Sequence, residues 1–197
     1  GTGRVPYDIY AGNAQQIADG ALDMRNAGSE HGNLIGGGRI AYQFNAGAAE
    51  GLTLGLHAFT ARISAEVPPS ATRVRAYGGY AVYDTDKWEN IAEIYLFDNQ
   101  DLSGGSGSHH SNAGFAQLGY RAPWGVPYAR YERTALAQSD QYFAAQDGGG
   151  SYHRVALGVR FDVDLKSALK LELANTRLTD RTRDQYGEGL VQYAIRF

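Results

Sequence analysis

The sequence predicts an all-β protein: an antiparallel up-and-down transmembrane β-barrel of about ten strands, forming one domain over residues 1–197. Three observations predict this fold. Apolar and polar side chains alternate along extended stretches, these stretches recur through the whole chain, and the connections between them alternate between long and short. No apolar run approaches the roughly 20 residues of a membrane-spanning helix, so a membrane span would have to be made of strands.

The first five expected strands are Val5–Asn13, Ile35–Phe44, Leu52–Arg62, Arg73–Tyr83 and Trp88–Asp98. Each is close to the 9–11 residues that a tilted spanning strand needs, and in each the apolar residues recur at every second position. The expected apolar faces are Tyr7, Ile9 and Ala11; Ile40, Tyr42 and Phe44; Leu52, Leu54 and Leu56; Val74, Ala76, Gly78, Tyr80 and Val82; and Ala92, Ile94 and Leu96.

The last five expected strands are Gly114–Arg121, Tyr128–Thr134, Tyr152–Val163, Ala168–Leu178 and Gly189–Phe197. The same period of two predicts them. Their expected apolar faces are Ala116, Leu118 and Tyr120; Ala129 and Tyr131; Val155, Leu157, Val159 and Phe161; Leu169, Leu171 and Leu173; and Val191, Tyr193, Ile195 and Phe197.

The final strand ends on an aromatic residue, Phe197. In this it resembles the C-terminal strand of bacterial outer-membrane β-barrels. The resemblance implies that Tyr193 and Phe197 form an assembly signal, and that the barrel-assembly machinery is a partner. The alternative for this stretch is the buried last strand of a β-sandwich.

The connections between the expected strands alternate between long and short along the chain. The long ones are Ala14–Asn33, Ser64–Thr72, Asn99–Asn112, Ala135–Ser151 and Thr179–Glu188, and the short ones lie near Gly47, Asp84, Trp124 and Lys166. Short periplasmic turns and longer extracellular loops are typical of transmembrane barrels, whereas a β-sandwich has no reason to sort its loops. With an even number of strands, both termini are expected on the short-turn, periplasmic side.

Aromatic residues gather beside the short turns. They are Tyr42, Phe44, Tyr83, Trp88, Tyr120, Trp124, Phe161, Tyr193 and Phe197. Rings at one end of the strand pairs predict a girdle at a membrane interface, because a sandwich core would spread its aromatics along the strand centres.

Composition excludes several classes of function. The 197 residues include no Cys and one Met, so disulfides and thiolate metal sites are absent. A net charge of −3 gives no electrostatic case for a nucleic-acid partner. We expect no cofactor and no metal. Because neither an initiator Met nor a basic and apolar leader is present, we expect a processed protein or a fragment.

Four segments carry a more specific resemblance: Ala113–Arg121, Val126–Arg133, Ala156–Val163 and Ser167–Leu173. Together they resemble the C-terminal half of proteobacterial porins of the phosphate-selective type and related porin-like proteins. The resemblance implies a passive channel in the outer membrane of a Gram-negative cell, without enzymatic turnover, and leaves a homo-oligomer open. Such porins have about 16 strands. The chain is therefore either part of a larger barrel or a small barrel of its own.

Charged residues on the expected polar faces should line the lumen, because unpaired charge is costly in lipid. A basic wall predicts passage of small hydrophilic, anionic solutes. The alternative is that the charges pair across strands and fill a non-conducting structural or adhesion barrel. The expected pore-lining residues are Arg39, Arg73, Arg75, Arg121, Arg130, Glu132, Arg154, Arg160, Lys170, Glu172 and Arg196, with Arg177 on the same kind of face.

Catalytic candidates exist without a recognisable pattern, so no catalytic residue is predicted. His109 and His110 lie in a Gly- and Ser-rich segment near Asp98 and Asp101, and His153 lies at the outer end of a strand. Proteases of the omptin type carry Asp and His at the rim of a ten-stranded barrel, which keeps a rim protease as a third hypothesis. Solvated loop histidines are the more common situation.

Overall fold

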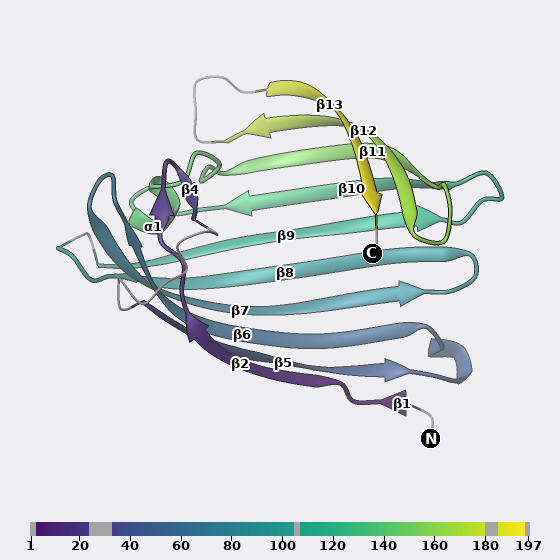
Figure 1. The fold of residues 1–197 in the computed structure, drawn as a ribbon, viewed down its shortest axis with the longest axis horizontal. Helices are drawn as coiled ribbons and strands as arrows, with labels where there is room; N and C mark the ends of the chain where they lie inside the picture. Colours follow the sequence, from purple (N-terminus) through teal and green to yellow (C-terminus); the bar gives the residue numbers. More distant parts are fainter. Residues whose placement is uncertain (1–2, 24–32, 105–106, 180–184, 196–197) are drawn as a thin grey trace.

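The computed structural model describes residues 3–23, 33–104, 107–179 and 185–195. These residues form one antiparallel sheet whose strands follow each other in chain order (Figure 1). The long strands are β2 (Tyr7–Asn13), β5 (Leu34–Phe44), β6 (Leu52–Ala65), β7 (Ser70–Asp84), β8 (Trp88–Asp101), β9 (Ser108–Tyr120), β10 (Val126–Ala135), β11 (Tyr152–Asp162), β12 (Ser167–Leu178) and β13 (Gln185–Ile195). The expected all-β, up-and-down fold of about ten strands is confirmed.

Three short strands and two short helical turns complete the described chain. They are β1 (Gly3–Arg4), β3 (Ile17–Ala18), β4 (Ala21–Leu22), η2 (Gly47–Ala49) and α1 (Gln141–Ala144). Strand β1 pairs with β5 in the same register as β2, and the two are separated by residues 5–6. Pro6 has no N–H to donate to the ladder, which accounts for the interruption.

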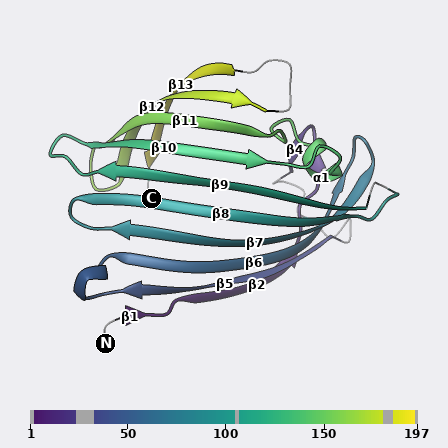
Figure 2. The same ribbon diagram turned by 180° about the vertical axis from the view of Figure 1, so that it is seen from behind.

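The sheet has two edges, β2 and β13. In the described part of the chain no backbone pairing joins them, and each pairs with one long neighbour only. Both views place the two edges at opposite borders of a curved sheet, with the short turns at one end and α1 and β4 at the other (Figures 1 and 2). Gly3 and Ile195 belong to the short-turn end, because they pair with Phe44 and Ser167.

Three of the expected long connections are wrong. Strands β6 and β7 continue to Ala65 and from Ser70, so only residues 66–69 connect them. Residues 102–107 join β8 to β9, and residues 179–184 join β12 to β13 in place of the expected Thr179–Glu188. Strands β6 and β7 extend because Ile63 and Val74 have apolar cover on the concave face of the sheet. Long connections remain between β2 and β5 and between β10 and β11.

That cover comes from segments that the sequence predicts as plain loops. Ile17 of β3 and Ala145, next to α1, pack with Ala61, Ile63 and Val74 in a small core, to which Leu22 and Tyr142 add apolar surface. Strand β3 pairs with β4 and makes one bridge to Ala65 of β6. One end of the concave face is therefore filled by these insertions.

The convex face is apolar and exposed. Every one of the ten long strands contributes a large, solvent-exposed apolar side chain to it: Ile9, Ile40, Leu56, Tyr77, Ile94, Leu118, Tyr131, Leu157, Leu173 and Val191. Leu169, Leu171 and Leu173 share this face with Val191, Tyr193 and Ile195, as the alternation predicts.

Aromatic side chains occupy the short-turn end of the same face. Trp88 and Tyr120 lie opposite each other in the β8–β9 ladder, with ring centroids 5.3 Å apart. Tyr42 contacts Phe44 edge to face at 4.7 Å. The clustering expected from the sequence is present, and its role as a membrane girdle stays a prediction.

Candidate functional site on the concave face

Strands β10, β11 and β12 place a cluster of ionisable side chains on the concave face. Because side chains alternate along a strand, Tyr128, Arg130 and Glu132 share one face of β10. The antiparallel ladders bring Arg154 opposite Glu132, and Glu172 opposite Gly158, on that same face.

Glu172 is the centre of this cluster. Its Oε1 accepts a hydrogen bond from Arg130 Nη2 at 2.8 Å and lies 3.5 Å from Arg154 Nη2. Its Oε2 accepts from the Tyr128 hydroxyl at 2.6 Å and lies 3.1 Å from Lys170 Nζ. Only 3% of Glu172 is exposed. The buried carboxylate thus lies among three cations and accepts a hydrogen bond from one hydroxyl.

A glycine makes room for this arrangement. Gly158 on β11 lies directly between Tyr128 on β10 and Glu172 on β12. A Cβ at this position would lie 2.2 Å from the Tyr128 hydroxyl oxygen. Because Gly158 has no side chain, the Tyr128 ring can cross over β11 to reach Glu172. No pattern in the sequence predicts this contact.

The network continues to the sheet edge. Arg154 Nη1 lies 2.8 Å from Glu188 Oε2 on β13, and Arg130 Nε donates to Glu132 Oε1 at 2.6 Å. Tyr152 donates from its hydroxyl to Glu132 Oε2 at 3.4 Å. Ion pairs therefore link β10 through β13 on one wall.

A second cluster lies nearer the short turns. Arg160 Nη2 on β11 donates to Glu89 Oε2 on β8 at 2.9 Å, and Arg160 Nε donates to Asp162 Oδ1 at 2.9 Å. Arg121 lies 3.2 Å from Glu89 and 2.6 Å from Asp84. The Arg160–Glu89 contact passes over β9 and β10, which side chains can do only where strands curve toward one another.

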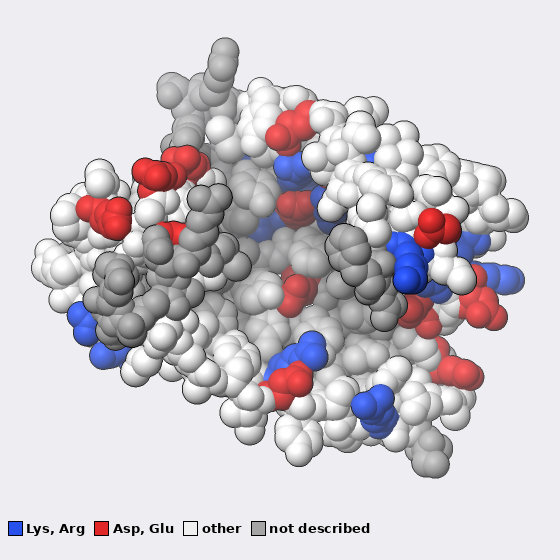
Figure 3. Space-filling model, viewed as in Figure 1, with Lys and Arg blue, Asp and Glu red and all other residues white. Residues whose placement is uncertain are grey.

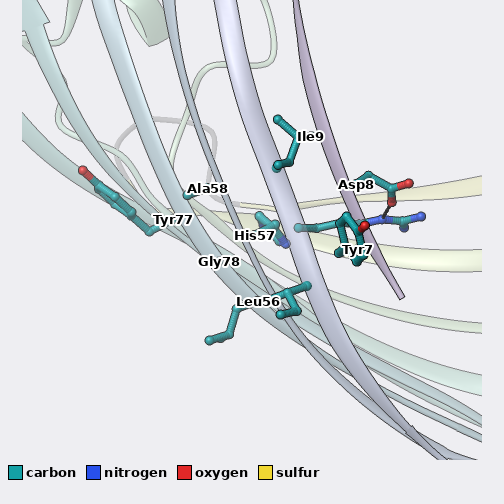
Figure 4. Close-up of a pocket in the computed structure, with 11 residues that line it drawn as sticks. Tyr7, Asp8, Ile9, Leu56, His57, Ala58, Tyr77 and Gly78 are labelled. Carbon is teal, nitrogen blue, oxygen red and sulfur yellow. Dashed lines mark hydrogen bonds and ion pairs between the residues drawn. The ribbon is translucent and has the colours of Figure 1, made fainter. Parts of the chain in front are cut away.

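A third group lies on β2, β5, β6 and β8. Arg39 Nε contacts Asp8 Oδ2, the Tyr95 hydroxyl donates to Glu93 Oε1 at 2.8 Å, and His57 lies 3.8 Å from Glu93. On the convex side of β2, β5, β6 and β7 runs an apolar groove, bordered by Ile9, Leu56 and Tyr77 (Figure 4).

The structure thus pairs the expected wall cations with acids. Arg39, Arg121, Arg130, Arg154, Arg160 and Lys170 each have a carboxylate partner within 4.0 Å. Figure 3, which looks onto the concave face, shows acidic and basic side chains intermixed in the central hollow. Arg130 and Arg154 share Glu172, whereas Arg160 pairs with Glu89. These three arginines therefore do not form a single basic patch on the concave face.

Two expected wall residues, Arg73 and Arg75, lie on the convex face, so their assignment to the lumen is wrong. The expected apolar face of their strand is reversed as well: Val74 and Ala76 are fully buried on the concave side, and Tyr77 is exposed on the convex side. The error has a physical reason. Near the end of a strand, beyond the apolar stretch, charged side chains can face outward. Arg177 is also on the convex face, opposite His153.

Two further predicted residues, Arg196 and Phe197, lie outside the described residues. Tyr193, the other residue expected to signal assembly, is exposed on the convex face of β13, opposite Leu169.

The rim beside α1 holds a buried polar cluster. His109 Nε2 lies 3.0 Å from Asp101 Oδ2, and His109 Nδ1 lies 3.3 Å from Ser139 Oγ. Asn99 Nδ2 donates to Asp140 Oδ2 at 2.8 Å, and Asp140 Oδ1 accepts from the Tyr142 backbone N–H at 3.0 Å. Burial raises the pKa of Asp140 above its usual value. The sequence points to His109 and Asp101, but nothing in it points to Ser139, which reaches His109 only through the fold.

The other two histidines are apart from this cluster. His110 is exposed and lies 3.7 Å from Asp98, and His153 Nδ1 lies 2.7 Å from the Tyr131 hydroxyl. Among the described residues, no His, Asp and Glu side chains form a group of three that could hold a metal ion. Over the same residues, no helix is long and apolar enough to cross a membrane.

Comparison with known proteins identifies neither a family nor a function for the chain. No model of a protein family matches the chain, and no curated protein is similar to it at a significant level.

Proposed function

We propose that the chain forms the wall of an outer-membrane, porin-like channel for passive diffusion of small hydrophilic solutes. One observation carries the proposal: all ten long strands expose large apolar side chains on the convex face, whereas the concave face is charged. Soluble monomers rarely expose a contiguous apolar patch of more than a few hundred Å². In a membrane, the apolar side chains of the convex face would contact lipid, and the charged side chains of the concave face would contact water.

The proposed orientation follows from the ends of the strands. The short turns and their aromatic side chains would lie at the periplasmic interface, and the end with β3, β4 and α1 would face the outside of the cell. Strands β2 and β13 would have to be joined in the membrane, directly or through further strands. Unpaired backbone groups in lipid cost several kcal/mol each. The barrel-assembly machinery is the partner expected for insertion, and a homo-oligomer stays open.

The concave wall would act without turnover. Its paired charges offer donors and acceptors that replace part of the water around a passing solute. The preference for anions expected from the sequence stays a prediction. The ion pairs weaken the case for it, because each paired carboxylate offsets the charge of its cation.

The proposal is tested by solute flux into vesicles that contain the refolded full chain. We expect small sugars to enter these vesicles faster than protein-free vesicles, and larger oligosaccharides to be excluded. Folded, inserted protein that admits no solute would reject the channel and favour the alternative, a non-conducting structural or adhesion barrel.

A second candidate, hydrolysis at the outer rim, is favoured by the chain of contacts Asp101–His109–Ser139. A base within reach of a hydroxyl and oriented by a carboxylate is the arrangement of a nucleophilic triad, although here Ser139 faces Nδ1 of the imidazole. A fluorophosphonate probe tests it. Labelling that disappears in Ser139→Ala would support a hydrolase, and no labelling of the wild type would exclude a fluorophosphonate-reactive serine.

A further inference from the structure

The convex face carries a set of arginines at the end opposite the aromatic side chains. Arg62 on β6, Arg73 on β7, Arg133 on β10 and Arg177 on β12 each lie within three residues of the end of their strand, at Ala65, Ser70, Ala135 and Leu178. All four are exposed. We refer to these four residues as the basic rim.

The basic rim differs from the concave wall in its lack of acidic partners. Over the described residues, no carboxylate pairs with Arg62, Arg73, Arg133 or Arg177, and Arg73 contacts only the amide oxygen of Gln100, at 3.3 Å. The neighbouring Arg75 does have an acid, Asp98, at 3.2 Å. Within the described residues, these four guanidinium groups therefore lie on one surface without a carboxylate partner.

Two of these arginines lie directly opposite each other. Arg62 is the cross-strand partner of Arg73 in the β6–β7 ladder. Like charges in this position destabilise a sheet, unless an anion binds between them. The arrangement therefore favours a bound anion at this site over an empty one.

The basic rim borders the apolar band directly. Arg133 follows Tyr131 by two residues on the same face of β10, and Arg177 follows Leu173 by four on β12. A ligand that contacts both surfaces must combine an apolar chain with an anionic group. Arginine presents paired N–H donors that match the oxygens of a phosphate.

We propose that the basic rim binds the phosphate groups of anionic lipids in the membrane leaflet at the outer end of the sheet. This inference rests on the proposed membrane location and goes beyond it, because a channel wall does not need lipid selectivity. Each arginine near an anionic headgroup strengthens binding several-fold. The protein should therefore retain phosphate-bearing lipids in preference to zwitterionic ones.

The test compares two variants of the full chain with equal loss of charge. The rim variant carries Arg62→Gln, Arg73→Gln and Arg133→Gln. The control carries Arg4→Gln, Lys87→Gln and Lys166→Gln, which remove three cations at the short-turn end that have no ion pair within the described residues. Each protein is reconstituted in phosphatidylcholine bilayers with and without phosphatidic acid, and bound lipids are quantified by native mass spectrometry.

We expect the rim variant to lose its preference for phosphatidic acid by at least about tenfold, and the control to keep it. Equal loss in both variants, or no loss in the rim variant, would overturn the proposal. Displacement of the lipid by inorganic phosphate at matched concentration would also overturn it, in favour of a site for free phosphate. Insertion into both bilayers without lipid preference would reject the basic rim alone, whereas failure to insert into either would reject the membrane location as well.

Discussion

The Tyr128 hydroxyl donates a 2.6 Å hydrogen bond to Glu172, two strands away, by passing over Gly158 of the strand between them. This contact joins β10 to β12 without using the backbone ladder. It holds the carboxylate that Arg130, Arg154 and Lys170 share. The glycine is therefore a determinant of the charged wall.

The first prediction concerns that glycine. Gly158→Val should displace the Tyr128 ring and break its hydrogen bond to Glu172. The expected loss in free energy of unfolding is about 1–3 kcal/mol, from overpacking and a buried carboxylate with one donor fewer. Gly187→Ala is the control, since its nearest atom lies 3.8 Å from an added Cβ. Denaturant unfolding in detergent measures both, and equal costs would contradict the role given to Gly158.

The second prediction concerns Glu172 itself. Glu172→Gln removes the buried charge that three cations share, so we expect a loss of about 3–5 kcal/mol in stability. Glu188→Gln removes one charge at a more exposed pair with Arg154, and should cost at most about 1 kcal/mol. The same unfolding assay compares them. A Glu172 variant as stable as the Glu188 variant would show that the buried network is not what holds this wall together.

The third prediction concerns the convex face. Leu173 is 72% exposed in the middle of the apolar band, whereas Asn175 follows it on the same face toward the rim. Leu173→Arg should lower the stability of the inserted protein by about 2–4 kcal/mol, and Asn175→Arg by at most about 1 kcal/mol. Unfolding from phospholipid vesicles measures the difference. An arginine tolerated equally at both positions would argue against lipid on this face.

The fourth prediction is a pH dependence at the rim. Because burial raises the pKa of Asp140, the folded state holds this proton more tightly than the unfolded state does. The free energy of unfolding should therefore fall as the pH rises from the ordinary value of 3.8 through the raised pKa, and then level off. His109 and Asp101 are the ionisable side chains that act on this carboxylate: His109 lowers its pKa and Asp101 raises it, and both effects are smaller than that of burial.

The variant Asp140→Asn lacks this titration. The stability of wild type minus that of Asp140→Asn should thus decrease over the same window, in unfolding curves recorded at a series of pH values. A difference that rises with pH would mean that the ionised carboxylate is stabilised by its hydrogen bonds more than burial penalises it.

Local alternation was sufficient to predict much of this fold. In β11 and β12 it places Leu157 and Leu173 on one face and Arg154 and Glu172 on the other, as the ladder confirms. A period of two is a property of single strands, so it survives without knowledge of their neighbours. Which face meets the interior is a different question, and β7 shows the limit: Val74 is buried on the concave side by Ile17 and Ala145, which are distant in the chain.

Side-chain contacts between distant strands could not be predicted from the sequence. Arg160 meets Glu89 at a separation of 71 residues, and Ser139 meets His109 at 30. Their partners depend on sheet curvature and on the path of the segment around α1, and neither leaves a local pattern. The small elements β3, β4 and α1 were missed because they are too short to show a period.

The most direct test of the channel is current across a planar bilayer that contains the folded full chain. We expect stepwise, ohmic conductance. We also expect the reversal potential to shift toward cation preference when Arg130, Arg154 and Arg160 are changed together to Gln, because the carboxylates of their clusters are left in excess. Absence of any conductance from protein shown to be folded and inserted would rule out a channel.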